Sequence, residues 1–141
     1  MNKDILVVVA RSDDNTQVGN AIINFGENQI NEGTALSHQE GTSQININES
    51  GIYQISYQLE GIDQGTSTRF NFNAILLVNN MPLTETLNEG AVLSETIVNN
   101  RYTLTSTVIL KLSVGDILQL GTLSLENVTY PNARIDIEKI G

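Results

Sequence analysis

The stretch Gly51-Ile-Tyr-Gln-Ile-Ser-Tyr-Gln-Leu59 constrains the fold of this chain more than any other segment. From Tyr53 onward, aromatic or aliphatic residues occupy every second position, and Gln or Ser fills the positions between them. Successive side chains of a β-strand point to opposite faces, so this alternation predicts a strand with one buried face and one polar face. The polar run 46–50 and Gly51 mark its start.

The rest of the chain repeats this pattern between short turn segments. Long strands are expected at 69–78 and 101–112, and shorter ones at 5–10, 21–25, 34–36, 44–48, 83–87, 91–98, 117–120, 123–125 and 133–138. No segment keeps a 3.6-residue period over the length of a helix. About ten strands without helices predict an all-β domain, either a sandwich, a jelly roll or a barrel.

Length and composition limit the partners and the chemistry. A chain of 141 residues is expected to form one domain. Its net charge of −9, with seven scattered basic residues, argues against nucleic-acid binding. No stretch approaches the roughly 20 apolar residues of a membrane helix. The absence of cysteine excludes disulfides, thiolate metal sites and a cysteine nucleophile.

The apolar run at residues 5–10 stands near the start of the chain, where a signal peptide would lie. It is too short for a typical signal-peptide core, and no small-residue cleavage pattern follows it. We therefore predict a first strand there and no signal peptide in this chain.

The order of several short motifs resembles the C1q/TNF-like jelly-roll family. The motifs are Ile23-Asn-Phe25, Gly51-Ile-Tyr53, Val78-Asn-Asn80, Leu112-Ser-Val-Gly-Asp-Ile-Leu-Gln-Leu120 and Ala133-Arg-Ile-Asp-Ile-Glu-Lys-Ile140. The chain is most similar to the C-terminal domain of bacterial collagen-like spore-surface glycoproteins of the BclA type. The resemblance implies a single domain over residues 1–141, with an N-terminal strand and loop at 1–20 and the family-like core at 21–141.

Four motif residues are expected to define the fold rather than any chemistry. Gly51 permits a backbone conformation or a close approach that a side chain would block. Tyr53 combines a large apolar body with a hydroxyl that needs a partner. Gly115 suits a left-handed turn position, and Asp116 can bond the nearby backbone.

The resemblance also implies a two-sheet jelly-roll sandwich that assembles as a homotrimer about a threefold axis. Leu76-Leu77 and Ile109 give their strands apolar residues on both faces, so something besides the core covers them, either another copy or a loop. Parity alone does not separate interface from core. The candidate interface residues are Tyr57, Phe70, Phe72, Leu77 and Ile109.

The resemblance points to a non-enzymatic structural and interaction module on a bacterial spore (exosporium) or cell surface. It would drive trimerisation and make multivalent contact with a host or surface protein or glycan. Family relatives carry a collagen-like stalk before this domain, whereas this sequence contains no such triplet run. The route of attachment is therefore not predicted.

The alternative is a carbohydrate-binding, lectin-like jelly roll or a phage-fibre tip. Such sites offer an exposed aromatic platform with amide and carboxylate neighbours. In this chain Tyr130 and Asn132, which we expect in a loop, are the candidate ligand contacts.

Neither catalysis nor a cofactor is predicted. His38 is the only histidine, is expected to be exposed on a polar strand, and has no serine on a strained elbow beside it. Calcium would find its best carboxylate clusters at Arg11-Ser-Asp-Asp-Asn15 and Glu60-Gly-Ile-Asp63, but neither has calcium-loop spacing. We expect these acids to face solvent.

Overall fold

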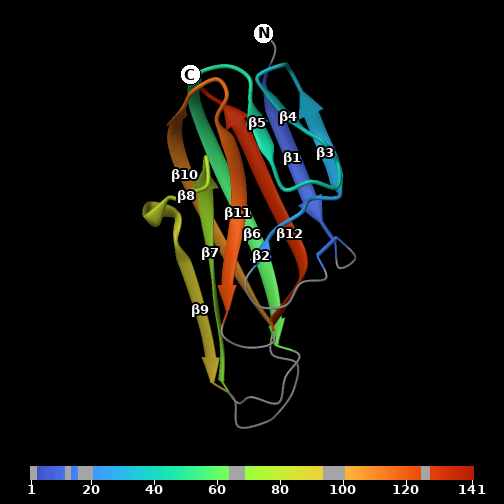
Figure 1. The fold of residues 1–141 in the computed structure, drawn as a ribbon, viewed down its shortest axis with the longest axis vertical. Coiled ribbons are helices and arrows are strands. Elements are labelled where there is room, and N and C mark those ends of the chain that lie inside the picture. Colours follow the sequence, from blue (N-terminus) through green and yellow to red (C-terminus); the bar gives the residue numbers. More distant parts are fainter. Residues whose placement is uncertain (1–2, 12–13, 16–20, 64–68, 94–100, 125–127) are drawn as a thin grey trace.

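The chain forms two stacked antiparallel β-sheets (Figure 1). The computed structural model describes residues 3–11, 14–15, 21–63, 69–93, 101–124 and 128–141. In chain order, the strands are β1 (Ile5–Ala10), β2 (Ala21–Ile22), β3 (Glu27–Glu32), β4 (Leu36–His38), β5 (Ile45–Ile47), β6 (Gly51–Asp63), β7 (Arg69–Val78), β8 (Met81–Pro82), β9 (Asn88–Leu93), β10 (Arg101–Leu112), β11 (Ile117–Ser124) and β12 (Val128–Lys139). A short 3-10 helix, η1 (Thr84–Thr86), lies between β8 and β9. No helix in this described part is long and apolar enough to cross a membrane.

One sheet has five strands and the other has seven. The five-stranded sheet follows the order β10-β6-β12-β1-β3. The seven-stranded sheet follows β4-β5-β11-β7-β8, with β2 paired to β11 and β9 paired to β7. The predicted all-β sandwich is confirmed, with twelve strands in the described residues where about ten were expected.

The alternation in β6 holds as predicted. Its four apolar side chains from Tyr53 to Leu59 are buried, and Gln54 and Gln58 are exposed. One core cluster fills the space between the sheets and draws buried residues from β1, β2, β4, β5, β6, β7, β10, β11 and β12. Each large apolar side chain buried there stabilises the fold by about 1.5–3 kcal/mol relative to exposure.

The expected strand at 83–87 is instead the helix η1, and Thr86 explains the difference. Thr86 is fully buried, and its hydroxyl accepts a hydrogen bond from Leu76 N at 2.9 Å and donates one to Leu83 O at 2.7 Å. The β7 backbone pairs with β9 up to Ala74 and with β8 from Leu77. The Thr86 side chain therefore supplies the partner that a neighbouring strand would otherwise provide.

Strand β3 was not predicted, because its sequence Glu27-Asn-Gln-Ile-Asn-Glu32 lacks an apolar alternation. It lies at the edge of the five-stranded sheet and pairs with β1, with a register shift between Val7 and Val8. An edge strand whose side chains are largely exposed does not need an apolar face, so periodicity gives no signal.

Several other expected boundaries also changed, among them those of β11 and β9. The segments at 117–120 and 123–125 belong to one strand, β11, which ends at Ser124. The expected strand at 91–98 corresponds to β9, which starts earlier, at Asn88, and residues 94–100 lie outside the described part.

The two motif residues of β6, Gly51 and Tyr53, both lie against backbone carbonyl groups of other segments. A Cβ atom on Gly51 would lie 2.5 Å from Gly141 O. Its absence lets the chain end pair with β6, where Ile52 N donates to Gly141 O at 3.1 Å. The buried Tyr53 donates its hydroxyl to Glu49 O at 2.6 Å, and burial raises the pKa of Tyr53.

The turn between β10 and β11 is built on the other two motif residues. Gly115 has a φ of 93°, the left-handed conformation that glycine adopts without strain. Its amide donates to Ile47 O at 2.8 Å, and the Asp116 carboxylate accepts from Ser113 N at 2.8 Å. The turn is therefore held by a hydrogen bond within it and by another to β5.

Candidate functional site

The outer face of the five-stranded sheet carries the polar side chains that alternate with the core residues. The strand register places Thr105 of β10, Gln58 of β6, Arg134 of β12 and Val9 of β1 in one row. The next row consists of Thr107, Ser56, Asp136 and Val7. Opposite residues on paired strands are about 5 Å apart, so each row is a continuous band across the sheet.

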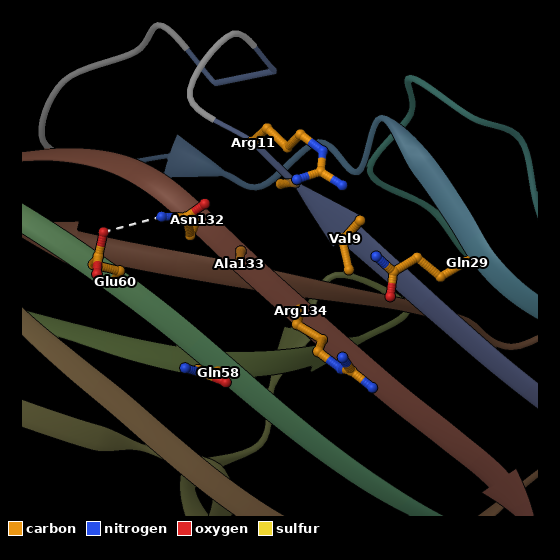
Figure 2. Close-up of a pocket in the computed structure, with 9 residues that line it drawn as sticks. Val9, Arg11, Gln29, Gln58, Glu60, Asn132, Ala133 and Arg134 are labelled. Carbon is orange, nitrogen blue, oxygen red and sulfur yellow. Dashed lines mark hydrogen bonds between the residues drawn. The ribbon is translucent and has the colours of Figure 1, made fainter.

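A hollow of about 270 Å³ lies on this face where β6, β12 and β1 run side by side (Figure 2). Its lining residues are Val9, Ala10, Arg11, Gln29, Gln58, Glu60, Asn132, Ala133 and Arg134. A second hollow of about 390 Å³ extends over β6 and β10 and shares Gln58 and Arg134 with the first. We call the first one the amide hollow, after its three amide side chains.

The charged groups around the amide hollow are paired. Arg11 Nη2 is 3.0 Å from a carboxylate oxygen of Glu27. Arg134 Nε donates to Asp136 Oδ1 at 2.6 Å, and this hydrogen bond raises the pKa of Arg134. Both cations therefore have an acidic partner, and the hollow carries no isolated positive charge.

The two glutamines of the amide hollow differ from its asparagine in their hydrogen bonding. Asn132 Nδ2 donates to Glu60 Oε1 at 3.1 Å, the bond drawn in Figure 2. Within the described residues, the side chains of Gln29 and Gln58 have no hydrogen-bonding partner, and both are exposed. A primary amide offers two donors and a carbonyl acceptor, so these two residues can bind a polar ligand.

Three exposed isoleucines lie toward the other end of the same face. Ile140 is opposite Ile52, and its amide donates to Ile52 O at 2.7 Å. Ile109 is opposite Gln54, on the diagonal from Ile52. Their exposed fractions are 43% for Ile52, 60% for Ile109 and 48% for Ile140. We call Ile52, Ile109 and Ile140 the isoleucine patch.

The predicted interface residues do not gather at one place. Ile109 belongs to the isoleucine patch, whereas Leu77 is half-buried on the outer face of the seven-stranded sheet, against Gly121. Phe70 and Phe72 lie in β7, and their side chains are outside the described part. The structure thus separates Ile109 from Leu77.

Tyr57 is a core residue in this structure, so its assignment to an exposed interface is corrected. It is only 3% exposed, and its hydroxyl donates to Thr86 O at 2.7 Å, with Ala74 O at 3.3 Å. It points inward because its β6 neighbours on the same face, Ile55 and Leu59, fill the core. Burial raises the pKa of Tyr57 to about 12.

Tyr130 and Asn132, predicted as ligand contacts in a loop, lie in β12 and face different environments. Tyr130 is fully buried, which corrects its expected role as an exposed aromatic platform, and burial raises its pKa. A register shift between Thr129 and Asn132 interrupts the pairing of β12 with β6. Asn132 is exposed and lines the amide hollow.

His38 is buried, not exposed as expected, with only 6% of its surface accessible. Leu36 and His38 share the inward parity of β4. The two ring nitrogens lie 2.5 Å from Asn28 Oδ1 and 2.8 Å from Thr42 O, and the Phe25 ring meets the imidazole edge-on at 6.2 Å. The histidine therefore joins β3, β4 and the following loop.

The imidazole of His38 lines neither hollow. The only imidazole in the sequence is occupied at both nitrogens in the other sheet. The hydroxyls of Ser56 and Thr107 bond each other at 2.9 Å beside the second hollow. These hydroxyls therefore have no histidine base to activate them.

Sequence reasoning did not identify the amide hollow. Its residues come from β1, β3, β6 and β12, and only the register brings them together. The only signal for it in the sequence was the set of polar residues that alternate with the apolar ones in each strand, such as Gln58 within 51–59 and Arg134 within 133–138.

Comparison with known proteins identifies the fold and no closer relative. No protein-family model matches the chain, and no curated protein matches it. The crystal structure of murine APRIL at pH 5.0 superposes with a TM-score of 0.62 at 13% identity, covering 99% of this chain and 100% of that one. PRD1 vertex protein P5 gives a TM-score of 0.68 at 17% identity, covering 98% and 97%. The chain thus has a TNF-like jelly-roll fold.

Proposed function

We propose that this chain is a non-enzymatic, homotrimeric jelly-roll module that presents repeated contact sites on the surface of a larger assembly. The TNF-like fold extends over almost the whole chain. The isoleucine patch is the observation that carries the proposal, because it gives the five-stranded sheet an apolar contact area outside the core.

The patch favours self-association for electrostatic as well as hydrophobic reasons. Each copy carries a net charge of −9, so two copies repel wherever their acidic surfaces meet. Contact through uncharged isoleucines removes apolar surface from water. The charged neighbours of the patch, Lys111 opposite Ile52 and Glu138 opposite Gln54, are of opposite sign. Ile109, the most exposed of the three, is also one of the interface residues predicted from the sequence.

Display on a spore or cell surface is the setting that the C1q/TNF-like resemblance suggests. The shared fold with PRD1 vertex protein P5, which is named as a vertex protein, supports a place in a larger assembly. Three linked copies would raise the apparent affinity for a repetitive surface without a new type of contact.

The proposal is tested by the mass of the purified chain in solution, measured by light scattering on a sizing column over a dilution series. We expect three times the chain mass of 15.4 kDa. A mass of one chain throughout the series would overturn the trimer and leave only the fold in common with TNF-like proteins.

A further inference from the structure

The amide hollow has the size of a small-ligand site and lies apart from the isoleucine patch. Its volume of about 270 Å³ is slightly below the roughly 300 Å³ at which pockets for drug-sized ligands begin, so it suits only a small ligand. Gln58 is six residues beyond Ile52 on β6, which corresponds to about 20 Å along an extended strand. Contacts at the patch therefore leave room for a ligand at the hollow.

The pairing of charges selects a neutral ligand. Arg11 is paired with Glu27 and Arg134 with Asp136, so the positive charge that would attract an anion is already balanced by a carboxylate. A cation would be attracted by Glu60 but repelled by the arginines that line the same hollow. Uncharged polar groups meet neither penalty.

The remaining hydrogen-bonding groups match adjacent hydroxyls. Each hydroxyl of a polyol both donates and accepts, as does each primary amide. Gln58 and Gln29 are exposed on opposite sides of the hollow, on β6 and β3, and their side chains have no partner in the described residues (Figure 2). Glu60 and Asn132 add a carboxylate and a third amide at one end of the hollow.

The hollow also includes a small apolar area. Val9 lies outside the main core cluster, is buried, and lines the hollow between Arg134 and Gln29 (Figure 2). A sugar ring has C–H groups that can pack on such a methyl surface while its hydroxyls bond the amides around it. This combination does not require the aromatic platform that the buried Tyr130 cannot provide.

We propose that the amide hollow binds one ring of a neutral saccharide, with Gln58 and Gln29 bonding adjacent hydroxyls and Val9 packing against the C–H face of the ring. The second hollow, which shares Gln58 and Arg134, would accept a neighbouring ring beside Ser56 and Thr107. This inference goes beyond the proposed assembly and does not depend on it.

The test is a titration of the purified full chain with neutral sugars, followed by heteronuclear NMR. The probes are glucose, galactose, mannose, N-acetylglucosamine and β-1,4-linked disaccharides of glucose and of N-acetylglucosamine, with glucuronate and glucosamine as charged comparisons. We expect saturable shifts at the residues of the amide hollow with at least one neutral sugar, and weaker binding of both charged sugars. Tighter binding of glucuronate or glucosamine than of every neutral sugar would overturn the proposal, as would the absence of shifts with all probes.

A matched pair of variants identifies the binding residue. Gln58→Ala should weaken binding about three- to tenfold, the effect of losing one or two hydrogen bonds. Gln54→Ala, on the same face of the same strand and outside both hollows, should leave binding unchanged. Equal losses in the two variants would contradict the assignment.

The same spectra separate this proposal from the proposed trimer. Shifts at the hollow that follow protein concentration without sugar would mean that a second copy occupies it, and would overturn the saccharide assignment. The mass in solution, measured on the same samples, reports the trimer independently of any sugar.

Discussion

The Asn79 side chain donates a hydrogen bond from Nδ2 to Asp116 Oδ1 at 2.9 Å, although 37 residues separate the two. Asn79 lies in the turn between β7 and β8, with a φ of 53°, and its Oδ1 accepts from Ile117 N at 2.9 Å. Asp116 also holds its own turn through Ser113 N. One carboxylate thus ties two turns at the end of the sandwich.

Replacing Asp116 with Asn should therefore destabilise the protein. The substitution turns one acceptor oxygen into a donor that would face either Ser113 N or Asn79 Nδ2, both of which are donors. We expect a loss of about 1–2 kcal/mol in the free energy of unfolding, measured by urea denaturation. Glu89→Gln, the same change of charge at an exposed position of β9, serves as the control and should have little effect.

Stability should fall at alkaline pH through Tyr57. Its pKa is about 12 in the folded state, against about 10 in an unfolded chain. The folded state binds the phenolic proton more tightly, so this contribution is complete below pH 10 and is lost as the pH rises toward 12. The two-unit difference corresponds to at most about 2.7 kcal/mol.

Urea denaturation on either side of pH 10 measures this effect, and Tyr57→Phe isolates it. The variant should be less stable than the wild type below pH 10, because Thr86 O loses its donor. Above pH 10 the variant should lose less additional stability than the wild type. The loss that remains in the variant comes from Tyr53 and Tyr130, whose pKa values are also raised by burial. Identical pH profiles would contradict the assignment.

His38→Ala should destabilise the corner formed by β3 and β4. Asn28 Oδ1 and Thr42 O would both lose their ring partner, and a cavity would open beside Phe25. We expect a loss of about 2–3 kcal/mol in the free energy of unfolding by urea denaturation. The neighbouring Gln39 is exposed, so Gln39→Ala should cost less than 1 kcal/mol; equal costs would refute a structural role for the imidazole.

Ile109→Asp should dissociate the proposed trimer. The change places a negative charge in the isoleucine patch. Removing this carboxylate from water and bringing the carboxylates of three copies together are both unfavourable. Light scattering should report the mass of one chain, with an unchanged far-ultraviolet circular dichroism spectrum. Ile22→Asp is the matched control, since Ile22 is 40% exposed on the seven-stranded sheet, and it should leave the trimer intact. Dissociation by Ile22→Asp alone would move the interface to the other face.

The strands that sequence reasoning located best are those with a strict alternation. The segment 51–59 predicted the buried and exposed faces of β6, and the segments at 69–78 and 101–112 match β7 and β10. Edge strand β3 and helix η1 were not predicted, because their conformations depend on β1 and on the bond between Thr86 and Leu76.

The sequence by itself determined the all-β class, the two faces of β6 and the glycine turn at Gly115, since each depends on backbone geometry within a few residues. Only the tertiary structure decided that Tyr130 and His38 are buried, and that Tyr57 belongs to the core and not to an interface between copies. It also placed Gln58 beside Arg134. Such contacts depend on the register between strands far apart in the chain, and a shift of one residue would turn every side chain to the other face.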